Sequence, residues 1–500
     1  MTIFHHHAPR VAALLASGSM LASVATGALA QDYDADAIIN IGSLYEAQNL
    51  DNIAGVQGVH QALYANSYES LFLLNDAGQV ENLLATGYEA SEDGLTYAFT
   101  LRDGVSFHSG DPLTAADVKF SIERVASEVS KSARKKSLSN IVNIETPDDL
   151  TVVITLSSPS ISLPYNLSYI FVQNDTHEDF ANSVDGTGPY ELESFRRGAS
   201  VALTRNDDYW GEAPTNGGIT FNYFTDATAL SNALLTGAVD VVTGVESPDA
   251  LAQFKNNPDF IVTEGASTTK EVFAFNDRIE PFSNVTVRKA VSRAINKKRL
   301  LNSVWGDYGT LIGSFVPPTD PWFTDLTGVD AYDPESAKAM LEEAGYADGF
   351  TMTIDTPNVD PHPLVAQALQ ADLSEVGITV DINLITANEW YTKIYQSHDF
   401  DATLMAHVNH RDIGFYGIPD FYWGYNNPEV VELIASAETA ASEDEQVAKL
   451  AEANKIMAED AASVWLYLNP KIIVSSADVT GYPVNGLNSQ FFGYDIRKAD

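Results

Sequence analysis

Short runs in which apolar and polar residues alternate recur along the chain and predict β-strands. Side chains on a strand point in turn to its two faces, so alternation indicates a strand with one buried face. Continuous apolar runs indicate strands that are buried on both faces. The predicted strands are Ala37–Ser43, Thr96–Leu101, Val105–His108, Thr151–Leu156, Tyr190–Phe195, Ser200–Arg205, Asp240–Thr243, Ile378–Leu384, Val464–Leu468 and Ile472–Val474.

Apolar residues spaced three or four apart predict helices between these strands. The clearest helix follows Thr114, which forms a capping-box pattern with Asp117. Its apolar face consists of Val118, Ile122, Val125 and Val129. Further helices are predicted at Asp226–Gly237, Val285–Trp305, Asp333–Gly345, Leu364–Val376 and from Ser442 to Met457. Helices thus alternate with strands, which predicts an α/β or α+β fold with mixed sheets.

The segment Phe400–Tyr425 departs from this regular pattern. It contains seven aromatic residues in 26 positions, although aromatics make up only 10% of the chain. It begins with strand-like alternation and becomes polar at His407, Asn409, His410, Arg411 and Asp412. A polar loop at the end of a strand suggests a recognition surface, because loops on a rigid scaffold often carry function. An aromatic core with a solvated turn is the alternative, and Phe421, Tyr422 and Trp423 fit either a cleft wall or a core.

Composition limits the classes of function. A length of 500 residues allows two or three domains, and 45% hydrophobic with 19% charged residues describes a globular protein. The 28 Lys and Arg against 68 Asp and Glu give a net charge of −40. This charge repels phosphate backbones and anionic lipids, so we expect no nucleic-acid partner and a soluble monomer. The absence of cysteine excludes disulfides, thiol nucleophiles and cysteine-based metal sites.

Residues 1–30 have the pattern of a secretory signal peptide. Arg10 precedes the apolar run Val11–Leu15, and Ala28 and Ala30 satisfy the small-x-small rule for cleavage after Ala30. The apolar run is too short and too interrupted to span a membrane. No cysteine follows it, which argues against a lipoprotein. We therefore expect a periplasmic protein without membrane insertion after cleavage.

Motifs for catalysis or cofactor binding are absent from the sequence. There is no G-x-S-x-G, H-E-x-x-H or P-loop motif. The acidic spacing in Asp32–Asp36 lacks the glycine and glutamate of a calcium loop. The segment Gly186–Pro189 lacks the third glycine of a dinucleotide fingerprint. His407 and His410 could share a metal only on a helix, which the nearby glycines oppose. We expect no cofactor, no metal and no enzyme, with an exported hydrolase as the alternative class.

Four segments carry a resemblance to a known family. The chain resembles the peptide/nickel/oligosaccharide-type (family 5) extracytoplasmic solute-binding proteins of ABC transporters, which include the dipeptide- and oligopeptide-binding proteins. The resemblance covers essentially the whole chain after residue 30. The matching segments, in the family's order, are Leu101–Arg124, Gly186–Pro214, Ser283–Leu301 and Tyr332–Phe350.

The resemblance implies two lobes joined by a hinge, with a ligand held between them. Residues 31–65, 185–268 and 475–500 would form the core of lobe I, residues 66–184 an extra subdomain of that lobe, and residues 269–474 lobe II. Closure about a hinge converts ligand occupancy into a shape that a transporter can recognise. The implied function is capture of a small organic ligand, an oligopeptide by default, and delivery to the permease and ATPase subunits of an ABC importer. The match around His108 implies structure rather than ligand contact, with His108 in a structural hydrogen bond.

The resemblance also implies where the ligand binds. One contact region is the early loop with Tyr45 and Glu46, and a second is the lobe II segment that contains His407, Asn409, His410, Arg411 and Asp412. Extended peptides pair there with the backbone as an added strand. Relatives place a tryptophan against the ligand at the position of Trp390. We add Tyr416 and Tyr422 from the aromatic segment as candidates.

One departure from the family pattern bears on the ligand. Peptide-binding relatives have an aspartate that holds the α-ammonium group, and the aligned position here is His410, next to Arg411. Asp412 could take this role only after a shift of the loop. A guanidinium favours a carboxylate or phosphate, while His, Asn and Tyr side chains also suit sugar hydroxyls. The alternative ligand is therefore anionic or sugar-containing, either opine-like or an oligosaccharide.

Overall fold

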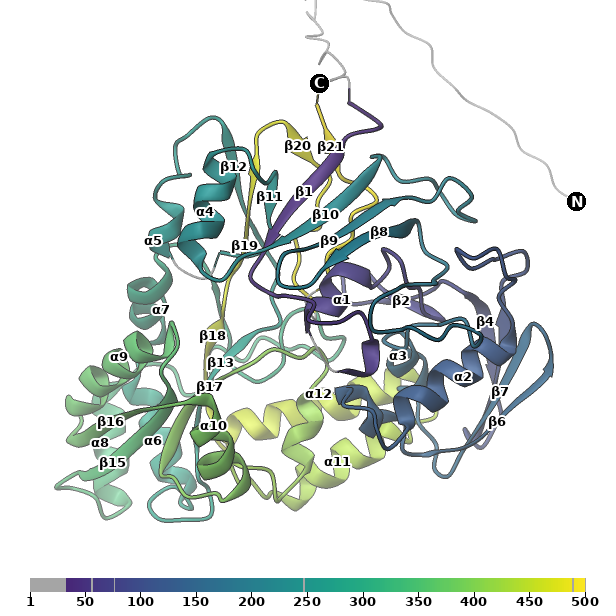
Figure 1. The fold of residues 1–500 in the computed structure, drawn as a ribbon. Coiled ribbons are helices and arrows are strands. Elements are labelled where there is room, and N and C mark those ends of the chain that lie inside the picture. The colour runs from purple at the N-terminus through teal and green to yellow at the C-terminus, as the bar shows by residue number, and fades with distance from the viewer. Residues whose placement is uncertain (1–32, 55–56, 76, 246–247, 488–489, 500) are drawn as a thin grey trace, which may run out of the picture.

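The computed structural model describes residues 33–54, 57–75, 77–245, 248–487 and 490–499, so the predicted signal peptide lies outside the described residues. Two large sheets and a four-stranded sheet organise the described chain (Figure 1). Within these ranges none of the helices has the length and apolar character needed to cross a bilayer.

Lobe I is built on a seven-stranded mixed sheet. Its central strand, β1, pairs in parallel with β10 and β11, and buries Ile39 and Ile41. Helix α1 covers one face of the sheet, and α4 and α5 cover the other. The strands, in sheet order, are β12 (Phe260–Gly265), β19 (Lys471–Ser476), β11 (Val241–Val242), β1 (Ile38–Ser43), β10 (Gly218–Tyr223), β9 (Ser200–Arg205) and β8 (Tyr190–Arg196). The helices are η1 (Asn52–Ala54), α1 (Gln57–Leu63), α4 (Ala227–Leu235) and α5 (Pro248–Leu251), and a hairpin of β20 (Val479–Thr480) and β21 (Arg497–Lys498) lies near the C-terminus.

The subdomain contains the four-stranded antiparallel sheet with helix α2 packed against it. The capping box is confirmed, because the backbone N and hydroxyl of Thr114 both bond to Asp117 Oδ2 at 2.8 Å. The helix ends at Ala126, so the prediction that Val129 lies on its buried face is wrong, and Val129 is 76% exposed. The elements are β2 (Phe72–Leu74), β3 (Val80–Asn82), β4 (Ala85–Ala90), β5 (Thr96–Leu101), α2 (Ala115–Ala126), η2 (Ala133–Leu138), β6 (Ile141–Asp148), β7 (Thr151–Leu156) and α3 (Leu163–Leu167).

The segment Val105–His108 is not a strand. Only an isolated bridge joins Ser106 to Pro112, because turns on both sides leave no room for a ladder. His108 makes the expected structural hydrogen bond, with Nε2 3.0 Å from the carbonyl oxygen of Gly188. This bond ties the turn to the segment that leads from the subdomain back into lobe I.

Lobe II is built on a six-stranded sheet whose two faces are both covered. Along β13, Phe273 and Phe275 face helices α6–α9, while Val272 and Ala274 face the aromatic segment and α10–α12. The strands, in sheet order, are β14 (Thr310–Leu311), β18 (Val464–Leu468), β13 (Lys270–Phe275), β17 (Ala402–His407), β15 (Phe350–Pro357) and β16 (Ile378–Ile385). The helices are α6 (Val285–Ala294), α7 (Lys297–Trp305), α8 (Pro334–Glu343), α9 (His362–Ser374), α10 (Ala387–Trp390), η3 (Tyr391–Gln396), η4 (Ile413–Gly417), α11 (Pro428–Glu438) and α12 (Glu443–Glu459).

The single helix expected over Val285–Trp305 is two helices. Ile295 is extended, and the side chain of Asn296 accepts a hydrogen bond from the backbone N of Arg299 as the N-cap of α7. An asparagine can stop one helix and start another because its side chain replaces the missing backbone partner. The break turns α7 towards β18, where it packs.

The described part of the chain crosses between the two large sheets twice. Residues 266–269 connect β12 of lobe I to β13 of lobe II, and residues 469–470 connect β18 back to β19. The two crossings touch, because the backbone N of Asn469 donates to the carbonyl oxygen of Thr269 at 2.8 Å. Together they form the hinge of a two-lobed fold. The second crossing lies earlier than the expected lobe boundary, since residues 471–474 belong to the lobe I sheet.

The second half of the aromatic segment belongs to the core of lobe II. Phe421, Tyr422 and Trp423 are all buried in the cluster on the α10–α12 face of the sheet. The ring of Trp423 stacks on Tyr416 with centroids 4.2 Å apart and an interplanar angle of 16°. The sequence alone fits either a cleft wall or a core for these three residues, and the structure places them in the core.

We expect Trp423→Ala to lower the free energy of unfolding by about 3–5 kcal/mol, because it removes a fully buried aromatic side chain and leaves a cavity. Chemical denaturation of the purified protein measures this. The control is Leu364→Ala on α9, where the side chain is exposed and the expected change is within about 0.5 kcal/mol. Equal effects of the two substitutions would contradict the placement of Trp423.

Candidate functional site

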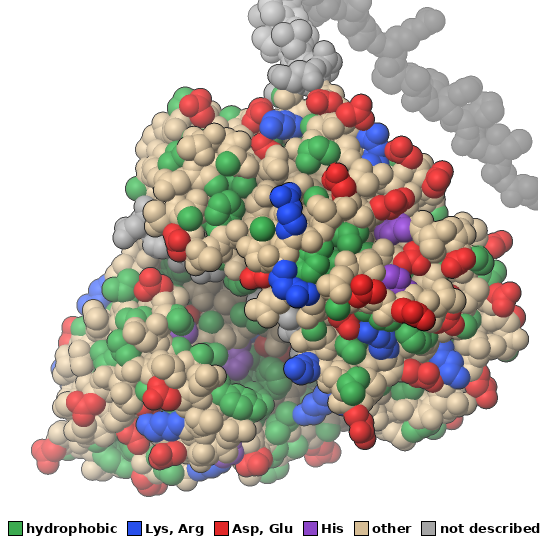
Figure 2. Space-filling view, in the orientation of Figure 1, with side chains coloured by type: hydrophobic (Ala, Val, Ile, Leu, Met, Phe, Trp, Pro, Cys, Tyr) green, Lys and Arg blue, Asp and Glu red, His purple; other side chains and the backbone are tan. Residues whose placement is uncertain are grey.

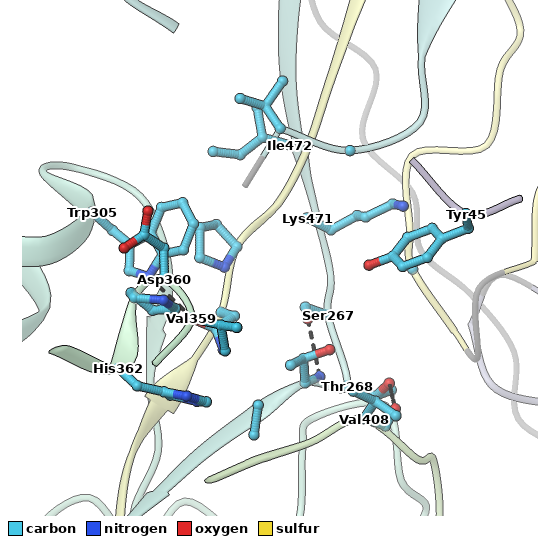
Figure 3. Close-up of a pocket in the computed structure, with 18 of the residues that line it drawn as sticks. Tyr45, Ser267, Thr268, Trp305, Val359, Asp360, His362, Val408, Lys471 and Ile472 are labelled. Carbon is cyan, nitrogen blue, oxygen red and sulfur yellow. Dashed lines mark hydrogen bonds between the residues drawn. The ribbon is translucent and has the colours of Figure 1, made fainter. Parts of the chain in front are cut away.

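A cavity of about 310 Å³ lies at the hinge, with walls from both lobes and from both crossings. Figure 2 shows the molecular surface hollowed between the two lobes, and Figure 3 shows the side chains around this hinge cavity. Lobe I contributes Tyr45 and Lys471, lobe II contributes His362 and Val408, and the crossings contribute residues 267–269 and 469–470. Movement of one lobe against the other must therefore change the shape of this cavity.

The lobe I wall is polar and fixed by hydrogen bonds. Tyr45 follows β1, is 37% exposed, and points its hydroxyl across the cavity beside Lys471 (Figure 3). Lys471 Nζ donates to the carbonyl oxygen of Thr243. Gln61 lies behind them, bonded to the hydroxyls of Ser43 and Thr243. The lobe I wall of the cavity thus carries the hydroxyl of Tyr45 and the ammonium group of Lys471.

Glu46, the neighbour of Tyr45, is directed elsewhere. Its carboxylate accepts a hydrogen bond of 2.9 Å from the backbone N of Gly198, in the turn between β8 and β9. The structure therefore places the two predicted residues of the early loop differently. Tyr45 lies on the wall of the hinge cavity, whereas Glu46 fastens the loop to the lobe I sheet.

The opposite wall is acidic and connected to the hinge. His362, at the start of α9, has Nε2 3.3 Å from Oε1 of Glu271, a buried residue of β13. Burial raises the pKa of the Glu271 carboxyl, although His362 and Asn469 act in the opposite direction. Asn469, in the second crossing, donates to Glu271 Oε2 at 3.2 Å and accepts from the indole N–H of Trp305. A chain of polar contacts thus joins the cavity wall to the hinge.

The predicted lobe II loop lies at two cavities. Val408 faces the hinge cavity, while Asn409, His410, Arg411 and Asp412 line a second cavity of about 610 Å³ between lobe II and the subdomain. These two sets are adjacent in sequence, so the cavities lie next to each other. The loop is one continuous piece of wall.

A buried lysine holds this loop. Lys270 Nζ donates to the carboxylate of Asp412 at 2.7 Å and to the carbonyl oxygen of Asn409 at 2.6 Å. Burial raises the pKa of Asp412 to about 6, although the Lys270 ammonium acts to lower it. Oδ1 of Asp412 is thus paired with a protein cation, whereas its buried Oδ2 has no hydrogen-bond partner among the described residues.

His410 and Arg411 join lobe II to the subdomain. His410 Nε2 lies 3.0 Å from the Asp320 carboxylate, and its carbonyl oxygen accepts a hydrogen bond from the hydroxyl of Tyr165. Arg411 has a positive φ of 54° and donates to the carbonyl oxygen of Gly78 at 3.0 Å. Its guanidinium lies over the ring of Tyr165.

The remaining candidates are packed in lobe II, away from both cavity walls. Trp390 donates its indole N–H to the hydroxyl of Thr403 at 2.9 Å, and the hydroxyl of Tyr416 donates to that of Ser463. His407 Nε2 lies 2.9 Å from the hydroxyl of Tyr422, and the two rings stack. His407, Trp390 and Tyr422 thus form a polar-aromatic layer beneath the loop.

The sequence gives no signal for several cavity residues. Asp360, His362 and Lys471 lie on unrelated segments, and only the fold brings them together with Tyr45. Among the described residues, no three carboxylate or imidazole side chains are arranged to share a metal ion. The hinge cavity presents an ammonium and a hydroxyl opposite a carboxylate and an imidazole.

We expect His407 to make the stability of the protein fall in mild acid. Burial and, to a lesser extent, Lys270 lower its pKa to about 3, so the unfolded chain binds a proton near pH 6.5 that the folded chain excludes. The stabilising effect is present above pH 6.5 and decreases as the pH falls, by up to about 1.4 kcal/mol per unit.

Chemical denaturation of the wild type and of His407→Gln between pH 4.5 and 7 tests this expectation. The variant should lose less stability across this range, since glutamine does not titrate and can still bond to Tyr422. His177→Gln in the subdomain is the matched control and should follow the wild type. Parallel curves for all three proteins would refute the assignment.

Comparisons with known proteins agree with this architecture. The model of the middle part of the bacterial extracellular solute-binding proteins, family 5, matches residues 79–427. A glutathione-binding protein GsiB from Salmonella paratyphi A is 30% identical over 370 residues, which are 71% of this chain and 70% of the relative.

Solved structures share the fold. The periplasmic binding protein DppA from Helicobacter pylori, in complex with the peptide STSA, has a TM-score of 0.75 and 23% identity, over 93% of this chain and 98% of that one. The binding protein AgaA from A. tumefaciens R10, in complex with agropinic acid, has a TM-score of 0.72 and 23% identity, over 93% and 99% of the two chains. At this identity the likeness shows the two-lobed fold.

Proposed function

The chain belongs to family 5 of the bacterial extracellular solute-binding proteins, and we propose that it captures its solute in the hinge cavity. It is the solute-binding component of an ABC importer. The observation that carries the proposal is that both lobes and both crossings supply walls of one cavity. A ligand there contacts both lobes at once and favours the closed arrangement, because it binds that arrangement more tightly than the open one.

An oligopeptide, most simply a dipeptide, is the ligand that we propose first. A volume of about 310 Å³ is at the lower end of the range of about 300–1,000 Å³ for small-molecule sites. Lys471 on one wall can pair with the carboxylate of a peptide, and Asp360 on the other with its ammonium group. The names of relatives point the same way, since GsiB is a glutathione-binding protein and DppA holds the peptide STSA.

An anionic or sugar-containing solute is the second candidate, and one specific observation favours it. Asp412, the acid nearest to the expected amine anchor, is already paired with Lys270, and His410 occupies the anchor position itself. AgaA, which has the same fold, is described in complex with agropinic acid. For a hydrolase we find no support: among the described residues of the hinge cavity, no hydroxyl is bonded to His362.

Residues 1–30 support a place for the protein outside the cytoplasmic membrane. We propose that they are removed after Ala30 and that the mature chain acts as a monomer in the periplasm, with a permease and an ATPase as partners. The net charge of −40 supports solubility there.

We expect ligand binding to compact the protein. Native mass spectrometry of protein purified without refolding identifies the bound solute, and small-angle scattering with that solute should show a smaller radius of gyration than the stripped protein. Tyr45→Ala should weaken binding roughly tenfold, or by about 1.4 kcal/mol, without changing the unfolding temperature.

Tyr391→Ala is the matched control for this experiment. Tyr391 is an exposed tyrosine on η3 of lobe II, and its removal should leave affinity unchanged. A zwitterionic dipeptide in the spectrum would support the first ligand over the second. Binding without compaction, or equal affinity of the Tyr45 and Tyr391 variants, would contradict capture in the hinge cavity.

A further inference from the structure

The second cavity collects cations in a protein that has few. It has a volume of about 610 Å³, and the subdomain contributes Arg134 and Lys136 while lobe II contributes Arg411. The whole chain has only 28 Lys and Arg in 500 residues, so three in one cavity wall is a local excess. Figure 2 shows Lys and Arg side chains along the right-hand rim of the hollow between the lobes.

Within the part of the chain that the structure describes, these three cations have no carboxylate partner. Among the described residues, no Asp or Glu oxygen lies within 4.0 Å of the charged nitrogens of Arg134, Lys136 or Arg411. The chain has 68 acidic residues, yet none of those described pairs with the half-buried Arg134 and Arg411 or with the exposed Lys136.

The two acids on the same wall are already engaged. Asp412 is paired with Lys270. Glu438 of α11 accepts hydrogen bonds from the hydroxyls of Ser160 and Ser162. Lys270 balances the charge of Asp412, so Glu438 is the one uncompensated carboxylate against three cations in this lining, and the cavity has a net positive wall.

Two tyrosines hold the guanidinium groups in place. Arg134 lies 3.5 Å over the ring of Tyr169, and Arg411 lies 4.5 Å over the ring of Tyr165. The two rings are 5.4 Å apart and perpendicular. Burial raises the pKa of Tyr169, while Arg134 and Arg411 both act to lower it, so both cations lie near this ring. Stacking fixes a guanidinium while leaving its N–H edges free to donate.

Arg411 also retains an unused donor. Its Nε is buried and has no acceptor among the described residues, although its terminal nitrogen donates to Gly78. Two guanidinium groups held close together repel each other in a medium of low dielectric. An oxyanion between them would remove this repulsion and accept bonds from both.

We propose that the second cavity binds an organic oxyanion, a carboxylate or a phosphate ester, between Arg134, Lys136 and Arg411. Asn140, Asn166 and Asn409 also line the cavity and can bond to the hydroxyl or amide groups of the same molecule. The inference rests on the proposed function, in that the oxyanion is part of the transported solute. It makes the subdomain, together with lobe II, a determinant of which solute is accepted.

Isothermal titration with defined probes tests the site on the full protein. Citrate and glucose 6-phosphate are the anionic probes, which separate carboxylate from phosphate, and glucose and dialanine are the neutral and zwitterionic counterparts. We expect one anionic probe to bind, glucose not to bind, and the anion affinity to fall as salt is raised. The double variant Arg134→Gln/Lys136→Gln should weaken the anion at least tenfold.

Lys135→Gln is the matched control, since Lys135 lies between the two residues on η2 but does not line the cavity. It should bind the anion as the wild type does. The single variant Lys136→Gln is expected to fold normally, because the side chain of Lys136 is exposed. A several-fold loss of anion affinity in this single variant, at an unchanged unfolding temperature, supports the site.

Two results would overturn the site: no binding of either anionic probe, or anion binding that is the same in wild type, double variant and Lys135→Gln. Small-angle scattering with dialanine separates this failure from that of the proposed function. If dialanine compacts the protein but neither anion binds, the proposed capture at the hinge is supported and the proposed oxyanion site is contradicted. If anion binding depends on Arg134 and Lys136 but no solute compacts the protein, the oxyanion site is supported and the capture mechanism is contradicted.

Discussion

The ion pair between Lys270 and Asp412 determines the position of the loop that both cavities share. Lys270 is the first residue after the hinge crossing and is fully buried, and its ammonium also bonds to the backbone of Asn409 and lies over Phe315. Removing one member of a buried pair is strongly destabilising, because it leaves an uncompensated charge. Residues 408–412 are therefore fastened to the start of β13. A movement of the hinge crossing next to Lys270 also displaces this loop.

The aromatic segment supports this arrangement from below. Tyr416, Tyr422 and Trp423 are buried behind the loop, and His407 connects the layer to β17 through its contact with Tyr422. A dense layer of rings resists deformation, since protein interiors have crystal-like packing. Residues 409–412, which line the second cavity, are thus held in a fixed position against the lobe II sheet.

Local patterns predict much of the fold but stop short of the site. The alternation at Thr96–Leu101 and the capping box at Thr114 depend on neighbours in sequence, and both are found as expected. The break at Asn296 depends on how α7 packs against β18, which no local pattern contains. The strand β13 is buried on both faces but begins with the charged residues Lys270 and Glu271, so it shows neither alternation nor a long apolar run and is missing from the predicted strands. Among the residues that line the two cavities, the resemblance points to Tyr45 and to the loop that ends at Asp412. His362, Lys471 and Arg134 come from distant segments, and only tertiary structure brings them to the cavities.

The order of strands in the lobe I sheet has a consequence for how the chain folds. β19 lies between β12 and β11, yet it follows every residue of lobe II in sequence. During synthesis, the sheet therefore has an open position until residues 471–476 appear, and β12 has no partner in it before then. Such long-range pairing is slow to form, and an unpaired edge can associate with other chains. The same two crossings that let the lobes move thus make lobe I the last part of the molecule to be completed.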